Sequence, residues 1–267
     1  MAEVELRGCT FSYDVAGGGE GATPFVWGHG LTSSRADEDV QPLVDTSVLA
    51  RTRPVLRYDA RGHGRSGDLA TPEQGAWSEL GVDQVALIDH LGWDDVIIGG
   101  ASMGTATALH AALELGARVR GLVLVIPPTA WETRAEQIEN YARMADLVLE
   151  HGVDVLLAGM RVMPPPDPFV DDDTWMERRA AALTAAAPER LAAVFRGAGH
   201  ADLPAPDDIA TITAPTLVLA WTGDAGHPAS TAERLGELLP NSEVVISSTR
   251  DDLDTWTSRT AAFLDGR

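Results

Sequence analysis

The chain has 267 residues, of which 45% are hydrophobic, enough for one large core with an insertion and too few for two ordinary enzyme domains joined by a linker. Its 40 acidic residues outnumber the 20 basic ones, which are all arginine, and the formal net charge is −20. A field of this sign repels phosphate backbones and anionic lipid headgroups, which argues against nucleic acids and membrane surfaces as partners.

The N-terminal residues and the cysteine content bear on where the protein works. The single cysteine, Cys9, cannot form an internal disulfide, and it lies in an alternating apolar stretch that is typical of a strand. The first residues lack the basic and apolar regions of a secretory signal, and no run of about 20 apolar residues is present to span a bilayer. We therefore expect a cytoplasmic protein.

Short apolar runs alternate with helical stretches along the chain. The pattern predicts strands over residues 3–10 and 11–16, with a turn near 17–19, and further strands over 24–27, 54–59, 95–100, 122–126, 216–221 and 243–247. It predicts helices over 77–91, 105–115 and 254–264. Strands separated by helices imply right-handed crossovers, and thus an α/β fold whose mostly parallel central sheet is flanked by helices.

Residues 127–214 interrupt this alternation. They are predicted to be largely helical, over 132–151, 172–187 and 187–199, with a proline-rich linker at 163–168. An insertion at this point would lie over the carboxyl ends of the strands, where open α/β sheets bind ligands. We expect an α/β core formed by residues 1–126 and 215–267 and a helical cap formed by residues 127–214.

The motif Gly-Ala-Ser-Met-Gly at residues 100–104 carries the clearest chemical signal. It follows a β-branched strand and opens a helix of small residues, a turn that presents the Ser102 hydroxyl above the sheet at a helix N-terminus. This context predicts that Ser102 is a nucleophile. An acyl-transfer serine also needs backbone N–H donors for the oxyanion. Met103 can supply one, and Leu31, in the loop after an earlier strand, can supply the second.

Four motifs in chain order resemble the α/β-hydrolase superfamily: Trp-Gly-His-Gly-Leu at 27–31, the stretch 58–67, the Ser102 motif, and Trp-Thr-Gly-Asp at 221–224. Within it, the chain is similar to small bacterial esterases, lactonases and cofactor-free haloperoxidase-like proteins. The resemblance covers most of the chain outside residues 127–214 and implies the α/β-hydrolase fold without a cofactor. It also implies that Asp224, which ends the penultimate strand, is the acid that orients a catalytic histidine.

The sequence departs from this family where the catalytic histidine is expected. Residues 245–253, after the last strand, contain no histidine, and the expected position falls at Ser248 or Thr249. An unassisted serine is a poor nucleophile, and losing one member of such a triad costs about 10⁴- to 10⁶-fold in kcat. The triad is therefore expected to be incomplete or to use an atypical base.

Three histidines are candidate replacement bases. His227 lies three residues after Asp224, His200 lies in a loop of the predicted cap, and His29 adjoins the loop that carries Leu31. The sequence leaves the choice among them open. No histidine has the spacing to carboxylates on one helix face that a metal site requires, so no metal is expected.

Two functions follow from these observations. The first is hydrolysis of a small carboxylic ester, lactone or thioester by Ser102, with the N–H groups of Leu31 and Met103 holding the oxyanion. The alternative is a non-hydrolytic descendant that binds a ligand, or performs a biosynthetic step, in the capped pocket without a functional triad. Apolar residues of the cap favour a partly apolar small-molecule substrate. The sequence has no heptad or exposed edge pattern that would specify an oligomer.

Overall fold

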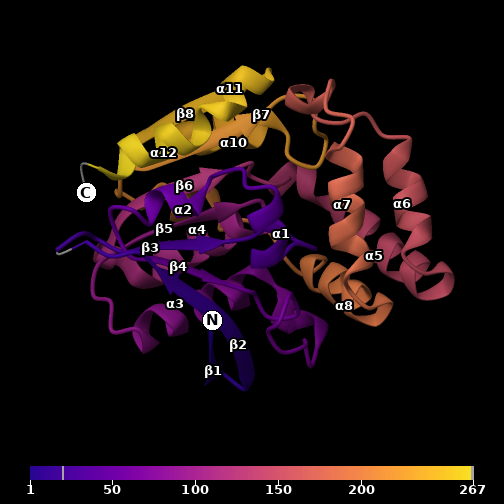
Figure 1. The fold of residues 1–267 in the computed structure, drawn as a ribbon, viewed down its shortest axis with the longest axis horizontal. Helices are drawn as coiled ribbons and strands as arrows, with labels where there is room; N and C mark the ends of the chain where they lie inside the picture. The colour runs from indigo at the N-terminus through magenta and orange to yellow at the C-terminus, as the bar shows by residue number, and fades with distance from the viewer. Residues whose placement is uncertain (20, 266–267) are drawn as a thin grey trace.

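A central sheet of eight strands runs through the molecule in the order β1-β2-β4-β3-β5-β6-β7-β8 (Figure 1). The computed structural model describes residues 1–19 and 21–265, so positions 20, 266 and 267 of the predicted core lie outside the described residues. The strands are β1 (Ala2–Leu6), β2 (Cys9–Ala16), β3 (Phe25–Gly28), β4 (Val55–Tyr58), β5 (Val96–Ala101), β6 (Val119–Val125), β7 (Thr216–Trp221) and β8 (Ser242–Ser247). Antiparallel pairing joins β1 to β2 and β2 to β4, and all other neighbours are parallel. The predicted mostly parallel sheet is confirmed.

Helices cover both faces of the sheet. One face is covered by α3 (Trp77–His90), α4 (Met103–Leu115) and α10 (Ala229–Leu238), and the other by α2 (Thr46–Leu49), α11 (Arg250–Asp254) and α12 (Trp256–Leu264). The short helices α1 (Arg35–Val40) and α9 (Pro206–Ile209) lie in connecting segments. No helix in the described part of the chain is long and apolar enough to cross a membrane.

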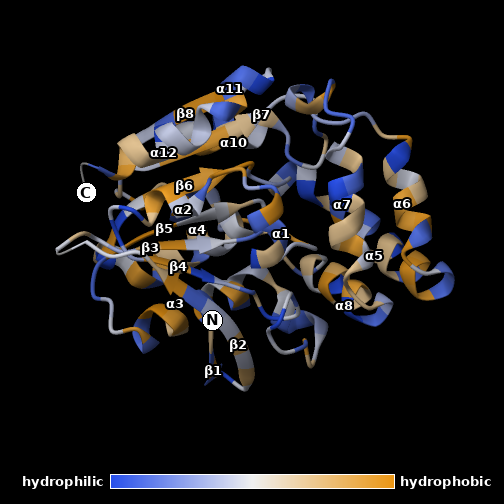
Figure 2. Ribbon diagram, viewed as in Figure 1, coloured by the Kyte–Doolittle hydropathy of each residue, from blue (hydrophilic) through white to orange (hydrophobic). Residues whose placement is uncertain are grey.

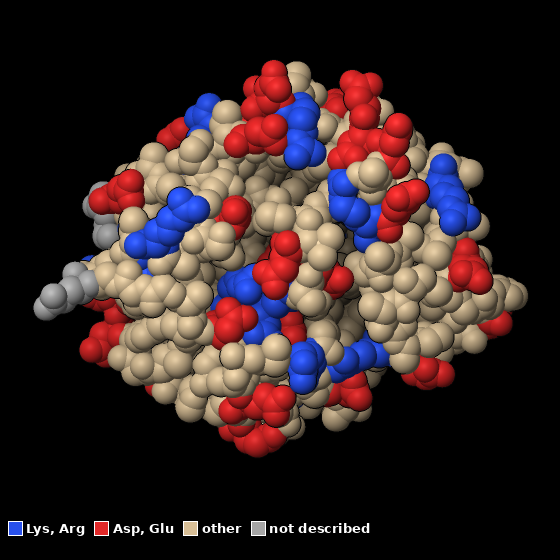
Figure 3. Space-filling view, in the orientation of Figure 1, with Lys and Arg blue, Asp and Glu red and all other residues tan. Residues whose placement is uncertain are grey.

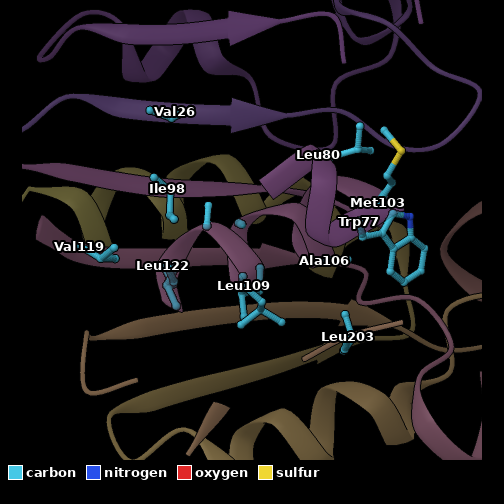
Figure 4. Close-up of a cluster of buried hydrophobic side chains, with 14 of the residues drawn as sticks. Val26, Trp77, Leu80, Ile98, Met103, Ala106, Leu109, Val119, Leu122 and Leu203 are labelled. Atoms are coloured by element: carbon cyan, nitrogen blue, oxygen red, sulfur yellow. The ribbon is translucent and has the colours of Figure 1, made fainter. Parts of the chain in front are cut away.

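The buried strands divide their side chains between two cores. Val26 and Ile98 pack with the α3–α4 face, whereas their neighbours Phe25 and Ile97 pack with the α12 face. Successive side chains of a strand point to opposite faces, so a strand buried on both sides is apolar throughout. Figure 2 shows this as apolar colour along the central strands, and Figure 4 shows part of the first core around Leu109.

The N-terminal hairpin turns at a different place from the one predicted. β1 ends at Leu6 and β2 begins at Cys9, so the turn lies at Arg7 and Gly8 and not near residues 17–19. Both turn residues have positive φ, 50° for Arg7 and 71° for Gly8. Two-residue hairpin turns of this hand match the twist of the strands and favour glycine. The alternation of apolar residues continues through this turn, which is why the pattern predicted a single strand over residues 3–10.

The predicted insertion contains four helices of eight or more residues: α5 (Arg134–His151), α6 (Asp154–Arg161), α7 (Trp175–Thr184) and α8 (Pro188–Ala198). They are grouped at one end of the sheet, at the right of Figure 1, and share a small apolar core. The sequence predicted α5, α7 and α8 but missed α6, whose eight residues are too few for a clear helical period. We call residues 127–214 the helical insertion; its role as a cap remains a prediction.

The C-terminal segment contains two helices where one was predicted over 254–264. Strand β8 ends at Ser247 and α11 begins at Arg250, leaving only Ser248 and the N-cap Thr249 between them. Thr249 and Asp252 form a capping box, in which each side chain accepts a hydrogen bond from the other's backbone N–H. The loop after the last strand is therefore nearly absent.

Arg134 joins the helical insertion to the core. Its side chain is buried, its Nε donates to the carbonyl oxygen of Ala201 at 2.7 Å, and its Nη2 donates to that of Ala198 at 2.7 Å. The guanidinium also lies 4.0 Å from the ring centroid of Trp77 on α3, a cation–π contact. One side chain thus connects α5, the segment after α8, and the core.

Arg134→Ala should lower the free energy of unfolding by about 2–5 kcal/mol, because it removes two buried hydrogen bonds, to the carbonyl groups of Ala198 and Ala201, and the contact with Trp77. Urea denaturation measures this change. The matched control is Arg143→Ala on the same helix, whose exposed side chain bonds only to Asn140; this variant should stay within about 0.5 kcal/mol of the parent. Equal stabilities of the two variants would contradict a clamping role for Arg134.

Candidate active site

Ser102 lies in a strained turn between β5 and α4. Its backbone has φ 53° and ψ −109°, a conformation that costs a non-glycine residue about 1–3 kcal/mol. Hydrogen bonds hold the turn in place: the Ser102 N–H donates to the carbonyl oxygen of Val125 at 2.9 Å, and the Thr105 hydroxyl bonds to the carbonyl oxygens of Gly100 and Val125. Strand β6 therefore supports the turn from the side, and the serine side chain points away from it.

Glycines let the end of β3 approach this turn closely. A Cβ atom at Gly100 or Gly104 would overlap with the carbonyl oxygen of Gly28. Two residues after Gly28, a Cβ at Gly30 would lie 3.6 Å from the Cβ of Ser102. The loop after β3 thus lies directly against the serine, which is the physical reason for the small residues in both motifs.

His227 connects Ser102 to Asp224. Its Nε2 lies 2.7 Å from the Ser102 Oγ, and its Nδ1 lies 2.8 Å from an Asp224 carboxylate oxygen, Oδ2. An ionised carboxylate only accepts hydrogen bonds, so Nδ1 carries the proton and Nε2 is free to accept from the serine hydroxyl. The three side chains are partly buried and form a continuous hydrogen-bonded chain.

A tight turn after β7 brings the acid and the histidine together. Asp224 accepts the N–H of Gly226 on its Oδ1 at 2.8 Å, and its own carbonyl oxygen accepts the N–H of His227 at 3.3 Å. Such a side-chain-to-backbone turn directs Asp224 and His227 to the same side of the loop. Pro228 follows at once as the N-cap of α10, and the N–H of Thr129 bonds to the Gly226 carbonyl oxygen.

Asp224 is held as a carboxylate by its donors. Burial raises its pKa, but the charge and hydrogen bond of His227, the N–H of Gly226 and the indole N–H of Trp221 outweigh burial, so the pKa lies below its usual range. The Trp221 Nε1 donates to the same oxygen, Oδ2, at 3.1 Å. The acid is therefore ionised and fixed in orientation, as a residue must be to fix the tautomer of a histidine.

The predicted oxyanion donors belong to the two segments that meet at Ser102. Met103 is the first residue of α4, and the first N–H groups of a helix have no partner within the helix. Leu31 follows Gly30, where an added Cβ would lie 3.6 Å from the Cβ of Ser102, and precedes Thr32, which has φ 61°. Both N–H groups belong to backbone segments fixed against the elbow.

Comparison with known proteins identifies the family of this chain. A model described as the alpha/beta hydrolase family matches residues 17–250. The chain belongs to this family. It is 35% identical over 108 residues to the dihydrolipoyllysine-residue acetyltransferase component of the acetoin cleaving system of Pseudomonas putida, which covers 40% of this chain and 28% of that protein. It is 27% identical over 179 residues to 3-oxoadipate enol-lactonase 2 of Acinetobacter baylyi, which covers 64% of this chain and 61% of that one. The matches thus span less than two thirds of these relatives.

Solved structures of the alpha/beta hydrolase family share the whole fold. A hydrolase from Pseudomonas aeruginosa superposes with a TM-score of 0.81 at 25% identity, over 99% of this chain and 97% of that one. A thermophilic esterase from Thermogutta terrifontis superposes with a TM-score of 0.79 at 22% identity, over 100% and 97% of the two chains. The predicted α/β-hydrolase fold is confirmed.

In this alpha/beta hydrolase, the expected histidine position after the last strand holds no histidine, and the geometry favours one of the two expectations, an atypical base, over an incomplete triad. Ser248 is exposed, and its backbone N–H bonds to the carboxylate of Asp252 at the start of α11. With so short a link between β8 and α11, the polypeptide has no loop there to carry a histidine. His227, one of the three candidates, lies within hydrogen-bonding distance of Ser102 instead.

The other two candidate bases are directed elsewhere. His29 is buried, its Nδ1 bonds to the Gly30 carbonyl oxygen at 2.8 Å, and its Nε2 accepts the N–H of Ala60 at 2.9 Å. With both nitrogens engaged, it supports the loop that carries Leu31. His200 is exposed in the segment just after α8, and no hydrogen bond joins its ring to Ser102 or Asp224 among the described residues.

Two cavities lie away from the triad. One, of about 520 Å³, is lined by residues of α4, β6 and the segment before β7, including Arg120. The other, of about 280 Å³, lies between α1, α2 and β4 and includes Glu38. Over residues 1–19 and 21–265, no group of three or more His, Cys, Asp or Glu side chains is placed to hold a metal ion.

Sequence reasoning missed two residues that support the triad. Trp221 binds Asp224, and Thr105 binds the elbow backbone, but neither role follows from residue type alone. The link between Asp224 and His227 did leave a signal in the sequence. Asp-Ala-Gly-His-Pro contains an acid, a glycine two residues later and a helix-starting proline, which together are typical of a tight side-chain-to-backbone turn.

Protonation of His63 should make the protein less stable in acid. Burial lowers the pKa of His63 to about 3, and its ring packs 5.1 Å from that of His29. Below pH 6.5 the unfolded chain binds a proton at this histidine and the folded chain does not, so stability is lost as pH falls towards 3.

The free energy of unfolding of the parent should therefore fall by about 1.4 kcal/mol per pH unit from this group alone. His63→Gln should reduce the slope by that amount in urea titrations from pH 6.5 to 4.5, whereas His151→Gln, at an exposed position, should leave the slope unchanged. An identical slope in all three proteins would refute this assignment.

Proposed function

We propose that the protein is a serine hydrolase of small carboxylic esters, lactones or thioesters, with Ser102 as nucleophile, His227 as general base and Asp224 as the orienting acid. The observation that carries the proposal is the position of His227, 2.7 Å from the Ser102 hydroxyl and 2.8 Å from the Asp224 carboxylate. Membership in the alpha/beta hydrolase family supports the same class of reaction. The alternative of a non-hydrolytic descendant depended on the lack of a base, and this contact removes that reason.

The first half of the reaction acylates Ser102. His227 accepts the hydroxyl proton on Nε2 while the Ser102 Oγ attacks the carbonyl carbon, and Asp224 stabilises the imidazolium that forms. The oxyanion of the tetrahedral intermediate accepts hydrogen bonds from the N–H groups of Leu31 and Met103. When the intermediate collapses, the bond to the leaving oxygen or sulfur breaks, and that atom takes the proton from Nε2.

The second half releases the acid product. A water molecule gives a proton to His227 and attacks the acyl carbon, and a second tetrahedral intermediate forms at the same oxyanion site. Its collapse breaks the bond to the Ser102 Oγ, which takes the proton back from Nε2. No redox step or cofactor is required, because the water supplies both the nucleophile and the proton.

The helical insertion serves in this proposal as the cap of the substrate pocket. Its residue Asp167 hydrogen-bonds to Thr222, directly before the acid loop, through both its backbone N–H and its carboxylate. Phe169 and Trp175 pack against Trp221 beneath that loop. Buried aromatic residues of the insertion are therefore packed on the tryptophan that binds Asp224, which holds the insertion beside the triad.

Covalent labelling tests the nucleophile. A fluorophosphonate should add one phosphonyl group to the intact protein by mass spectrometry, and peptide mapping should place it on Ser102. Ser102→Ala should not be labelled, and it should lose about 10⁴- to 10⁶-fold in kcat on p-nitrophenyl acetate. Failure of the parent to label or to turn over esters at high enzyme concentration would exclude the proposed function.

His227→Gln tests the base. We expect a loss of kcat similar to that of Ser102→Ala, and the double variant should be no slower than either single one, because triad members act as a unit. His200→Gln should leave kcat unchanged, and Ser248→His should not raise it, because Ser102 already has a base. If His200→Gln lost activity and His227→Gln kept it, His200 and not His227 would be the base.

A further inference from the structure

Arg179 is a cation on the helical insertion that belongs to no ion pair. It lies on α7, and its guanidinium carbon is 5.4 Å from the ring centroid of Trp175. Across the described residues, no carboxylate oxygen lies within 4.0 Å of its nitrogens. The preceding residue, Arg178, differs in this respect, because it binds the Asp172 carboxylate at 2.5 Å. In a chain with a net charge of −20, an unpaired arginine at this place needs an explanation.

A series of aromatic contacts places Arg179 beside the triad. Trp175, under the guanidinium, packs edge-to-face on Trp221 with ring centroids 6.1 Å apart. Trp221 in turn packs edge-to-face on His227 at 6.2 Å and donates its indole N–H to Asp224. The arginine is therefore linked to the catalytic imidazole through the rings of two buried tryptophans.

The environment of Arg179 is that of a recess. The residue is exposed, yet desolvation by the protein around it lowers the pKa of its guanidinium, and the charge of Asp224 raises that pKa in part. A group that is accessible to water and also surrounded by protein lines a hollow; it does not project from a convex surface. The visible face of the molecule is hollowed where the helical insertion meets the core (Figure 3).

We propose that Arg179 binds a carboxylate on the substrate, so that the preferred substrates are esters, lactones or thioesters that also carry a free carboxylate. This inference rests on the proposed function of Ser102. The planar fork of an arginine matches a carboxylate with two parallel hydrogen bonds, and the contact is strengthened in a partly desolvated recess.

The charge of the whole protein makes this cation decisive for an anionic substrate. The net charge of −20 repels anions at long range, and no bound carboxylate neutralises Arg179, so its positive charge is available in the recess. A monoanionic carboxylate suits a single arginine better than a phosphate dianion, whose second charge would stay uncompensated.

The test compares monomethyl and dimethyl esters of dicarboxylic acids with four to eight carbons, followed by pH-stat titration. The parent should prefer the monomethyl ester at one chain length. In Arg179→Gln the ratio of kcat/KM for monomethyl over dimethyl ester should fall about 10- to 100-fold, mainly through KM. Arg179→Lys should retain part of the preference, because it keeps the charge and loses the bidentate fork. Arg178→Gln, one residue earlier on the same helix, is the matched control and should leave the ratio unchanged.

A binding measurement separates this inference from the proposed function. In Ser102→Ala, monomethyl adipate, which carries one carboxylate, should bind with an affinity that Arg179→Gln lowers about 10- to 100-fold by calorimetry. If the parent hydrolyses neutral esters through Ser102 but the ester ratio is the same in Arg179→Gln, the inference about Arg179 is wrong and the proposed function stands. If no ester is hydrolysed and monomethyl adipate still binds in an Arg179-dependent way, the carboxylate site stands and the proposed function is wrong. If monomethyl adipate binds equally with and without Arg179, or not at all, the carboxylate site does not exist.

Discussion

The approach of two backbones at the ends of β3 and β5 constrains the rest of this site. Gly100 and Gly104 allow the elbow to touch the Gly28 carbonyl oxygen, and any side chain at those positions would push the two segments apart. The contact places Ser102 above the sheet and sets the loop after β3, with Leu31, beside it. It also explains why Ser102 is held at positive φ, because the hydrogen bonds from the Ser102 N–H to the Val125 carbonyl oxygen and from the Thr105 hydroxyl to that of Gly100 leave the turn no freedom to relax.

The histidine reaches Ser102 by a route that depends on the acid. In this chain the link between β8 and α11 contains only Ser248 and Thr249, so it offers no loop to carry a base. The turn after β7 compensates, since Asp224 binds the N–H of Gly226 and thereby folds the chain back far enough for His227 to lie between Asp224 and Ser102. One loop thus supplies both residues that activate the serine.

The helical insertion and the triad share one aromatic cluster. Phe169 and Trp175 come from the insertion, with ring centroids 3.8 Å apart, and both pack edge-to-face on Trp221 of β7. Trp256 stacks on the other side of Trp221 and donates its indole N–H to Ser247, the last residue of β8. A movement of the insertion would therefore shift Trp221, whose N–H orients Asp224. This arrangement links the shape of the pocket to the orientation of the acid, and it also places Arg179 close to the reacting groups.

The amino-acid sequence by itself determined the elbow that carries Ser102 and the mostly parallel sheet, because these follow from local patterns of glycine, apolar periodicity and turn residues; the resemblance of its motifs to a known family added Asp224. It could not decide among His227, His200 and His29, since the contact between His227 and Ser102 joins residues 125 positions apart in sequence and depends on the packing of β5 against β6 and β6 against β7. The short helix α6 and the turn at Arg7 were missed for a related reason: eight residues and two residues are too few for periodicity to outweigh the surrounding pattern. The role of Trp221, and the unpaired charge of Arg179, became visible only when the tertiary structure brought the helical insertion against the carboxyl end of the sheet.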